Sequence, residues 1–262
     1  MKTVPEPPPV VLAFSAHDPG GAAGIQADIE SINRNGGRCV SVITAVTAQN
    51  TTTFASILPQ NTINFRKQTD LLLADITVAA CKIGLIGSTL LITEIADVLT
   101  RLGRLPVVLD PVLHAGTGTE LATDETVEAM LELLIPVATV LTPNLKEALR
   151  LTGKSNKESA AKYLLEQGCH SVLITGADQS SPAVINTLYV KEQDPVDFEW
   201  QRLPGTYHGS GCTLASAIAA QLARGKDVRT AVELAQEYTW HTLKHGYRIG
   251  KSQFHPDRNY PE

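Results

Sequence analysis

Short apolar runs alternate with amphipathic stretches along most of the chain. The runs occupy residues 10–15, 39–46, 78–83, 106–109, 138–141 and 171–175. They are continuously apolar rather than alternating, which is typical of strands in a parallel sheet buried on both faces. The pattern therefore predicts an α/β fold with a central, mainly parallel sheet and helices on both of its faces.

Helical patterns fill the intervals between these runs. They cover residues 22–35, 65–74, 88–102, 155–167, 212–223 and 228–245. Ser155 and Glu158 have the spacing of a capping box that opens one of these helices, and Gly168 closes it. Two further stretches read as a β-hairpin, namely residues 186–190 and 198–203.

The organisation of the chain is that of one domain. No internal repeat and no interior low-complexity linker interrupts the alternation. We therefore expect a single doubly wound domain over residues 10–262. Residues 1–9 read MKTVPEPPP, and this composition predicts a flexible, proline-rich arm. The arm lacks the apolar region of a signal peptide.

Composition and charge exclude several classes of partner. The 262 residues carry a net charge of −5 with no basic cluster, which argues against nucleic acid and against an anionic membrane surface. No apolar run approaches the length of a membrane span. The four cysteines are far apart and form no C-x-x-C pair, so neither a zinc site nor a disulfide framework is expected. These features predict a cytoplasmic protein.

The segment GTYHGSGCT at residues 205–213 carries the strongest chemical signal. Gly209 and Gly211 allow the backbone around Ser210 to turn, so that successive N–H groups point into one concavity. The helix that follows adds its free N–H groups and the positive end of its dipole. This pattern predicts an anion hole for a phosphate. The alternative is an ordinary helix N-terminus with glycines that permit tight packing.

Cys212 adds possible chemistry to this turn. A thiol in the first turn of a helix has a stabilised thiolate, which predicts a lowered pKa. Such a group at the mouth of an anion hole is suited to accept a proton from a substrate hydroxyl. The alternative is a small residue packed under the loop, which we expect for Cys39, Cys81 and Cys169.

Two further segments follow the first two predicted strands. Asp28 lies one helical turn after Gly24 and is predicted to face the strand ends, where it can hold a substrate hydroxyl; the alternative is an exposed helix carboxylate. Gln49 ends the run SVITAVTAQ and offers both a donor and an acceptor, which match the edge of an aminopyrimidine. By itself, Gln49 fits an ordinary polar loop residue better than a substrate contact.

Oxygen ligands follow two later strands. Asp110 ends one strand, and Asn144 and Glu147 follow the next. These are ligands of the kind that hold Mg²⁺, directly or through water. Asn144 can also cap the helix that starts there, with Glu147 as its capping-box partner, and the two interpretations are compatible.

Six motifs in order make the chain resemble the hydroxymethylpyrimidine/phosphomethylpyrimidine kinases of the ribokinase-like superfamily. They are DPGGAAGIQAD, SVITAVTAQNT, KIGLIGS, LDPV, TPNLKEA and HGSGCT. The resemblance implies a ribokinase-like fold, and it implies that Asp28 and Gln49 hold the pyrimidine while Thr47 and Leu85 line its pocket. Cys212 stands where most relatives carry an aspartate base.

The resemblance further implies an ATP site and a reaction. Asp110, Asn144 and Glu147 would organise Mg²⁺ and the triphosphate, with Asp110 and Glu147 as the metal ligands. Thr175 lies in the nucleotide part, where the family often has a lysine. Family members phosphorylate the hydroxymethylpyrimidine and then its monophosphate in thiamine biosynthesis, and they are typically homodimers. A pyridoxal kinase and a non-catalytic pyrimidine-binding regulator are the two alternatives.

Overall fold

Nine strands form one sheet in the part of the chain that the computed structural model describes, which is residues 6–116, 118–177, 179 and 181–261. In chain order the strands are β1 (Val10–His17), β2 (Arg38–Gln49), β3 (Phe54–Pro59), β4 (Ala80–Ile83), β5 (Val107–Leu109), β6 (Val140–Leu141), β7 (Ser171–Ile174), β8 (Ala183–Val190) and β9 (Val196–Gln201). Across the sheet their order is β3-β2-β1-β4-β5-β6-β7-β8-β9. In this order the six neighbouring strands β2, β1, β4, β5, β6 and β7 pair in parallel. The strands β3, β8 and β9 pair antiparallel with their neighbours.

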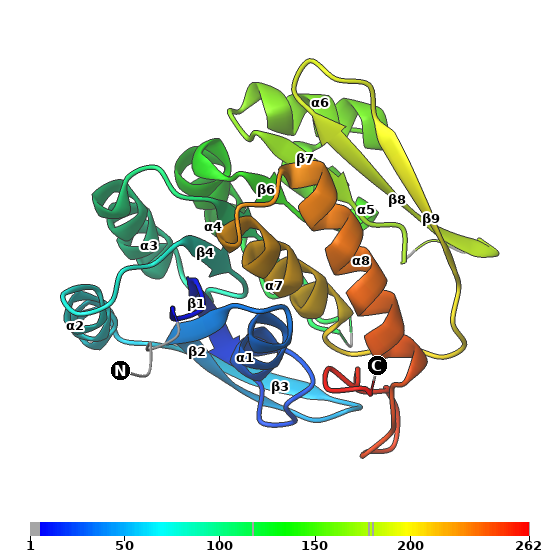
Figure 1. The fold of residues 1–262 in the computed structure, drawn as a ribbon, viewed down its shortest axis with the longest axis horizontal. Coiled ribbons are helices and arrows are strands. Elements are labelled where there is room, and N and C mark those ends of the chain that lie inside the picture. Colours follow the sequence, from blue (N-terminus) through cyan, green and yellow to red (C-terminus); the bar gives the residue numbers. More distant parts are fainter. Residues whose placement is uncertain (1–5, 117, 178, 180, 262) are drawn as a thin grey trace.

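Helices cover both faces of this sheet. They are α1 (Gly24–Arg34), α2 (Thr62–Leu73), α3 (Thr89–Leu102), α4 (Asp124–Ala129) with a π-helical and a 3₁₀ turn after it (Met130–Leu134 and Ile135–Val137), α5 (Leu145–Thr152), α6 (Lys157–Glu166), α7 (Ser210–Ala223) and α8 (Val228–Lys244). α1, α7 and α8 pack on one face, and α2 to α6 pack on the other (Figure 1). The predicted α/β architecture is confirmed.

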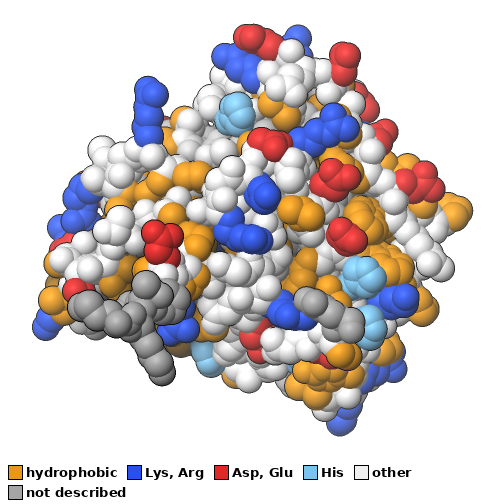
Figure 2. Space-filling model, viewed as in Figure 1, with side chains coloured by type: hydrophobic (Ala, Val, Ile, Leu, Met, Phe, Trp, Pro, Cys, Tyr) orange, Lys and Arg blue, Asp and Glu red, His pale blue; other side chains and the backbone are white. Residues whose placement is uncertain are grey.

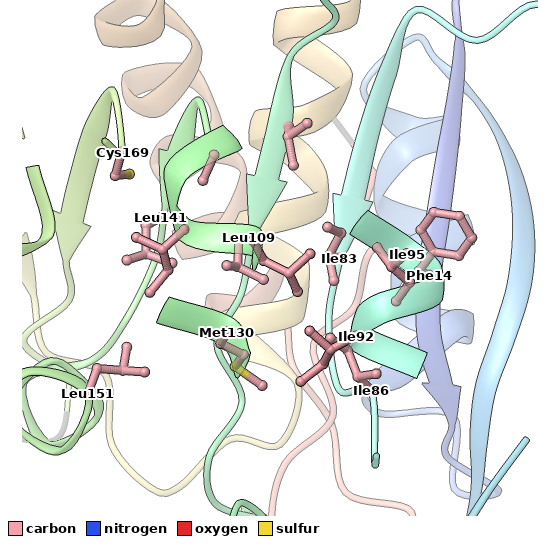
Figure 3. Packing of buried hydrophobic residues seen from close by; sticks show 14 of the residues in the cluster. Phe14, Ile83, Ile86, Ile92, Ile95, Leu109, Met130, Leu141, Leu151 and Cys169 are labelled. Atoms are coloured by element: carbon pink, nitrogen blue, oxygen red, sulfur yellow. The ribbon is translucent and has the colours of Figure 1, made fainter. Parts of the chain in front are cut away.

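The core has two layers because successive residues of a strand point to opposite faces. In β1, Leu12 and Phe14 join the layer beneath α2 to α6, whereas Val11 and Ala13 join the layer beneath α1, α7 and α8. All four side chains are fully buried. Figure 3 shows part of the first layer, in which Phe14 of β1 is drawn beside Ile95 of α3. This two-sided burial is the reason why the strand is apolar at every position.

Two parts of the fold were not expected from the sequence. The edge strand β3 follows a tight turn in which the Asn50 side chain accepts the N–H groups of Thr52 and Thr53, both at 2.9 Å. All of β3 is exposed or half-buried, and Ser56 interrupts its apolar residues, so its sequence contains no continuous apolar run. The helical segment from α4 to residue 137 was also missed, because it is broken into three short helical types.

One predicted helix start was wrong by a residue. The N-cap of α6 is Asn156, whose side chain accepts the N–H of Ser159 at 2.9 Å. Ser155 precedes this cap and does not form the expected box with Glu158. Asparagine competes well with serine for this position, and the spacing alone could not separate them.

The predicted arm at residues 1–9 lies only partly in the described chain. Residues 1–5 fall outside the described residues. Glu6, Pro7 and Pro8 are exposed, and the Pro9 carbonyl accepts the N–H of Arg38 at 2.9 Å. Regular pairing of the chain therefore begins at Pro9.

The surface carries charges of both signs. On the face shown in Figure 2, Lys and Arg side chains alternate with Asp and Glu rather than gathering into a patch. No helix among the described residues is long and apolar enough to cross a membrane. The carboxyl ends of the parallel strands lie at one edge of the sheet, which is where a doubly wound fold binds its ligands.

Candidate functional site

A cavity of about 240 Å³ lies where the parallel strands end. All of the predicted site residues except Asp28 line it: Thr47, Gln49, Leu85, Asp110, Asn144, Glu147, Thr175, Gly209, Ser210, Gly211 and Cys212. They come from the end of β2, from the segments that follow β4, β5, β6 and β7, and from the start of α7. The fold thus brings together residues that are far apart in the sequence.

The turn before α7 has the geometry that the glycine pattern predicted. Gly209 is the N-cap of α7 and has a φ of 85°, a left-handed conformation that favours glycine. A Cβ at this position would lie 1.8 Å from the Ala22 carbonyl oxygen, so a side chain there does not fit. Ser210 and Gly211 follow in the first turn of α7, whose N–H groups have no partner within the helix. These groups and the helix dipole favour an anion in the cavity.

The Cys212 thiol is half-buried and lies beside the Asp110 carboxyl. Desolvation raises the pKa of the thiol to about 12; the charges of Asp110 and Asp28 add to the rise, and Lys82 opposes it. The predicted lowering of the pKa is therefore wrong, because burial next to two carboxylates outweighs the start of the helix. At neutral pH the thiol keeps its proton, and as a neutral donor near Asp110 it lowers the pKa of that carboxyl.

Asp110 is the carboxylate at the floor of the cavity. It is 5% exposed, and its Oδ2 has no hydrogen-bond partner among the described residues. Burial raises the pKa of Asp110 to about 6; Asp28 adds to the rise, whereas Lys82 and the thiol of Cys212 lower the pKa. A buried carboxylate without a full set of partners is costly, so this atom is suited to receive a cation or a donor from a ligand.

Asp28 does not reach the cavity. Its side chain is fully buried and pairs with Lys82, with 2.8 Å between Asp28 Oδ1 and Lys82 Nζ. The same Oδ1 accepts the hydroxyl of Ser216 at 2.7 Å. The structure places Asp28 in a buried ion pair outside this lining, because α1 turns the residue toward the sheet and α7 instead of the cavity. The expected contact of Asp28 with substrate stays a prediction.

Lys82 is the partner that sequence reasoning missed. It occupies the middle of β4 with its side chain fully buried. Desolvation opposes its charge, but the neighbouring groups Asp28, Cys212 and Asp110 outweigh this and raise the pKa of Lys82 above its usual value. The signal was present in the sequence, since a lysine inside the apolar strand ACKI requires a buried anion nearby.

Asn144 and Glu147 form the capping box that the sequence allowed. The Asn144 side chain accepts the N–H of Glu147 at 2.9 Å, and Glu147 Oε2 accepts the N–H of Asn144 at 3.0 Å. Glu147 Oε1 also accepts the N–H of Leu113 at 3.3 Å. The capping interpretation is confirmed, and it fixes the Glu147 carboxylate at the edge of the cavity.

The end of β2 supplies polar groups to the opposite wall. Gln49 Nε2 donates to Thr47 Oγ1 at 2.9 Å, and the Thr47 hydroxyl donates to the His17 carbonyl, also at 2.9 Å. This chain of hydrogen bonds sets the orientation of the Gln49 amide. The apolar Leu85 lies in the same lining, and its carbonyl accepts the hydroxyl of Thr44 at 2.6 Å.

Asp18 and His208 form a second pair in the lining that was not singled out from the sequence. His208 Nε2 lies 3.4 Å from Asp18 Oδ2, and Asp18 also accepts the N–H groups of Gly20 and Ala23. Burial works to raise the pKa of Asp18, but the nearby His208 imidazole and the two N–H groups hold it below its usual value. The pair links the glycine-rich loop after β1 (residues 18–24) to the turn before α7.

A larger hollow of about 700 Å³ adjoins the cavity and shares part of its lining. Thr175, Asn144 and Ser210 border both spaces. Its remaining wall includes Trp200 of β9, Trp240 of α8 and Arg202, the residue that follows β9. No group of three or more His, Cys, Asp and Glu side chains in the described ranges is arranged to enclose a metal ion.

Known proteins are similar to this chain over most of its length. The family model described as phosphomethylpyrimidine kinase matches residues 18–257. A hydroxymethylpyrimidine/phosphomethylpyrimidine kinase of Haemophilus influenzae is 36% identical over 92% of this chain and 93% of its own. The structure of phosphomethylpyrimidine kinase from Clostridium difficile has a TM-score of 0.78 and 31% identity, covering 90% of this chain and 99% of that one. A Staphylococcus aureus pyridoxal kinase in complex with pyridoxal has a TM-score of 0.88 at 27% identity, covering 97% and 94%.

Proposed function

The chain belongs to the phosphomethylpyrimidine kinase family, and from this premise we propose that it transfers the γ-phosphate of ATP to 4-amino-5-hydroxymethyl-2-methylpyrimidine and then to the resulting monophosphate. The product would be the diphosphate used in thiamine biosynthesis. The observation that carries the proposal is the Gly209–Cys212 turn, which faces the same cavity as Gln49 and Asp110. That arrangement offers an anion site beside a polar pocket of the size of a small ring.

The pyrimidine is assigned to the wall formed by β2 and the loop after β4. Gln49 can both donate to and accept from the amino and ring nitrogen groups of the pyrimidine. Its hydrogen bond to Thr47 Oγ1 presets the orientation of the amide before the substrate binds. Leu85 covers one face of the ring, and the hydroxymethyl group then points toward Cys212.

The phosphates of ATP are assigned to the start of α7 and to Asp110, Asn144 and Glu147. A Mg²⁺ ion fits these residues, because Asp110 Oδ2 has no partner among the described residues and Mg²⁺ is usually bound by one or two carboxylates together with substrate phosphates. Asp110 and Glu147 would hold the ion, directly or through water. When bound, the ion would offset the charge of the triphosphate.

The reaction then depends on positioning and on charge stabilisation. The N–H groups of Ser210 and Gly211 stabilise the phosphoryl group as it moves toward the substrate. The sulfur of Cys212 accepts a hydrogen bond from the attacking hydroxyl, while its own proton stays on the thiol beside Asp110. As the new O–P bond forms and the bond to ADP breaks, the hydroxyl proton passes to an oxygen of the transferred phosphoryl group. Since the thiol pKa is about 12, Cys212 orients the hydroxyl as a neutral group instead of starting as a thiolate.

Thr175 takes a place that the family often gives to lysine, and Arg202 offers compensation for the missing charge. Arg202 lines the adjoining hollow and donates to the carbonyls of Ala177, Gln179 and Ser181 at 3.0, 2.7 and 2.7 Å. The guanidinium thereby holds the loop after Thr175 and brings a cation to the side of the hollow assigned to the nucleotide. The adenosine part of ATP is assigned to that hollow.

Turnover with Mg-ATP on three acceptors tests the proposed function. We expect mass spectrometry to find monophosphate and then diphosphate from the hydroxymethylpyrimidine. Pyridoxal is the second acceptor to measure, because the fold is also similar to that of pyridoxal kinase from Staphylococcus aureus. Product from pyridoxal alone would move the assignment to that activity. Tight binding of the pyrimidine without any product would contradict catalysis and favour a regulator.

We also propose that the protein is a homodimer through the β2–β3 edge. Val46 and Leu58 pair across this ladder, and they are 45% and 68% exposed. Ile63 at the start of α2 and Leu90 at the start of α3 are also exposed. An exposed apolar group of this kind is typical of an interface.

Sedimentation should give a dimer for the wild type and a monomer for Leu58→Asp, and a monomeric wild type would refute this proposal.

The cytoplasm is the proposed location. The chain has four cysteines, and each of them is free. Free thiols are stable in a reducing compartment, and ATP is available there. Cell fractionation tests this placement.

A further inference from the structure

The side chain of Arg258, in the C-terminal segment, packs against the glycine-rich loop after β1. The residue itself is far from this loop in the sequence. The segment passes beside the end of α8 (the red part of the ribbon in Figure 1), where the N–H of Asp257 donates to the Thr242 carbonyl at 2.9 Å. The Tyr238 hydroxyl donates to the carbonyl of Arg258 at 3.1 Å. Arg258 itself is 2% exposed. A buried guanidinium this well anchored needs an explanation, because its desolvation is costly.

The guanidinium contacts two segments that line the cavity. In the glycine-rich loop it donates to the carbonyl of Ala22 and, at 3.4 Å, to that of Gly21. In α7 its Nε donates to Thr213 Oγ1 at 2.9 Å. Its charge is balanced by Glu30 of α1, with 3.0 Å between Arg258 Nη1 and Glu30 Oε2. Arg258 therefore ties the loop after β1 to the first turn of α7.

Through Thr213, the same hydrogen bonds also fix the Gly209–Ser210 peptide group at the anion site. The Thr213 hydroxyl accepts from Arg258 and donates to the Gly209 carbonyl at 2.8 Å, and the Thr213 N–H donates to the same carbonyl at 2.9 Å. A peptide group is planar and trans, so fixing the Gly209 carbonyl toward α7 directs the N–H of Ser210 the opposite way. That N–H belongs to the residue that lines the cavity.

The contact between the two segments is also tight. A Cβ at Gly209 would lie 1.8 Å from the Ala22 oxygen and 2.9 Å from Arg258 Nη2. The Ala22 carbonyl thus lies against the turn, and Arg258 holds both partners at this point. A shift of either segment would move the N–H groups of the anion site relative to the pyrimidine wall.

We propose that Arg258 is a positioning residue, which aims the Gly209–Ser210 peptide at the phosphoryl group by clamping Ala22 and Thr213 together. The inference rests on the proposed phosphoryl transfer. Arg258 touches neither reacting group, so its effect is expected on kcat more than on the KM of either substrate. The guanidinium group can bind Ala22 and Thr213 at once because its N–H donors point in several directions. The single ammonium group of a lysine cannot bind both partners at once.

The test compares Arg258→Ala and Arg258→Lys with the wild type on whichever alcohol the wild type phosphorylates. We expect the kcat of both variants to fall by about 10²-fold, because a small displacement of a catalytic group has an effect of this size. The KM values should stay close to those of the wild type. Added guanidinium ion should restore part of the kcat of Arg258→Ala and none of that of Arg258→Lys. Hydrogen exchange should speed up in residues 18–24 and 205–213 of both variants.

Arg224→Ala is the matched control. Arg224 lies at the other end of α7, where it donates to the Asn35 carbonyl and to Gln221. This variant should keep its kcat and its exchange at residues 205–213. The inference is overturned if both Arg258 variants keep wild-type kcat, or if they lose stability while guanidinium restores nothing. A wild type without kinase activity would instead refute the proposed function, and the exchange experiment would still test the clamp.

Discussion

Cys212→Ala is expected to lower kcat by about 10²-fold while the affinity for ATP stays close to wild type. The thiol lies beside Asp110 in the cavity, where it can orient the attacking hydroxyl. Removal of the sulfur leaves the hydroxyl free to rotate and leaves Asp110 without this donor. Steady-state kinetics with the hydroxymethylpyrimidine and a separate titration of ATP binding measure the two quantities.

Cys212→Ser separates orientation from base catalysis. A serine hydroxyl also donates to Asp110 and accepts from the substrate, so it should recover much of the lost kcat if the neutral thiol orients the substrate. A thiolate base predicts the opposite, since serine ionises less readily than cysteine. The pH profile gives a second check: with a thiol pKa of about 12, the thiolate fraction rises about tenfold per pH unit in the alkaline range. A wild-type kcat that follows this rise would contradict the orienting role, which predicts a plateau above neutral pH.

Lys82→Met is expected to lower the free energy of unfolding by about 3–5 kcal/mol. The change leaves Asp28 fully buried without its cation, at a position that water does not reach. Methionine matches the lysine stem in length, so the loss reports the missing charge more than a cavity. Urea denaturation followed by circular dichroism measures the change in midpoint at an unchanged slope.

Two companion variants make this result specific. Lys82→Met combined with Asp28→Asn removes both charges, and it should recover most of the lost stability because the amide can still accept from Ser216. Arg66→Met breaks an ion pair of 2.7 Å between Arg66 and Glu94, in which the arginine side chain is 58% exposed, and it should leave the free energy of unfolding close to that of the wild type because solvent screens the pair. Equal losses for Lys82→Met and Arg66→Met would show that burial of the pair does not matter.

The fold could be predicted where burial leaves a pattern in the sequence. The run from Val11 to Phe14 is apolar at every position because its side chains enter both layers of the core. β3 could not be found in this way, since its exposed Ser56 interrupts the apolar residues of this edge strand. Caps were visible as residue types, but adjacent candidates such as Ser155 and Asn156 differ too little for spacing to decide.

The cavity could be predicted from one rule, namely that ligands bind after the carboxyl ends of parallel strands. That rule led to Gln49, Asp110 and Glu147, which line it. It could not give the pKa of Cys212, which depends on burial and on charges from three other segments. Arg258 was missed for a related reason, because its partners are more than two hundred residues away in the glycine-rich loop and forty-five away in α7.

The buried Lys82–Asp28 pair also constrains how such a chain can diverge. Each side chain can be made neutral by a single amino-acid replacement. The first replacement of either residue, however, leaves the charge of the other one buried and unpaired between the sheet and α7. A lineage that starts with both charges must therefore cross a poorly folding intermediate before it can reach a neutral pair. Positions 28 and 82 are expected to be inherited as a unit and to change together, and each is closed to the gradual drift that an exposed pair such as Arg66 and Glu94 permits.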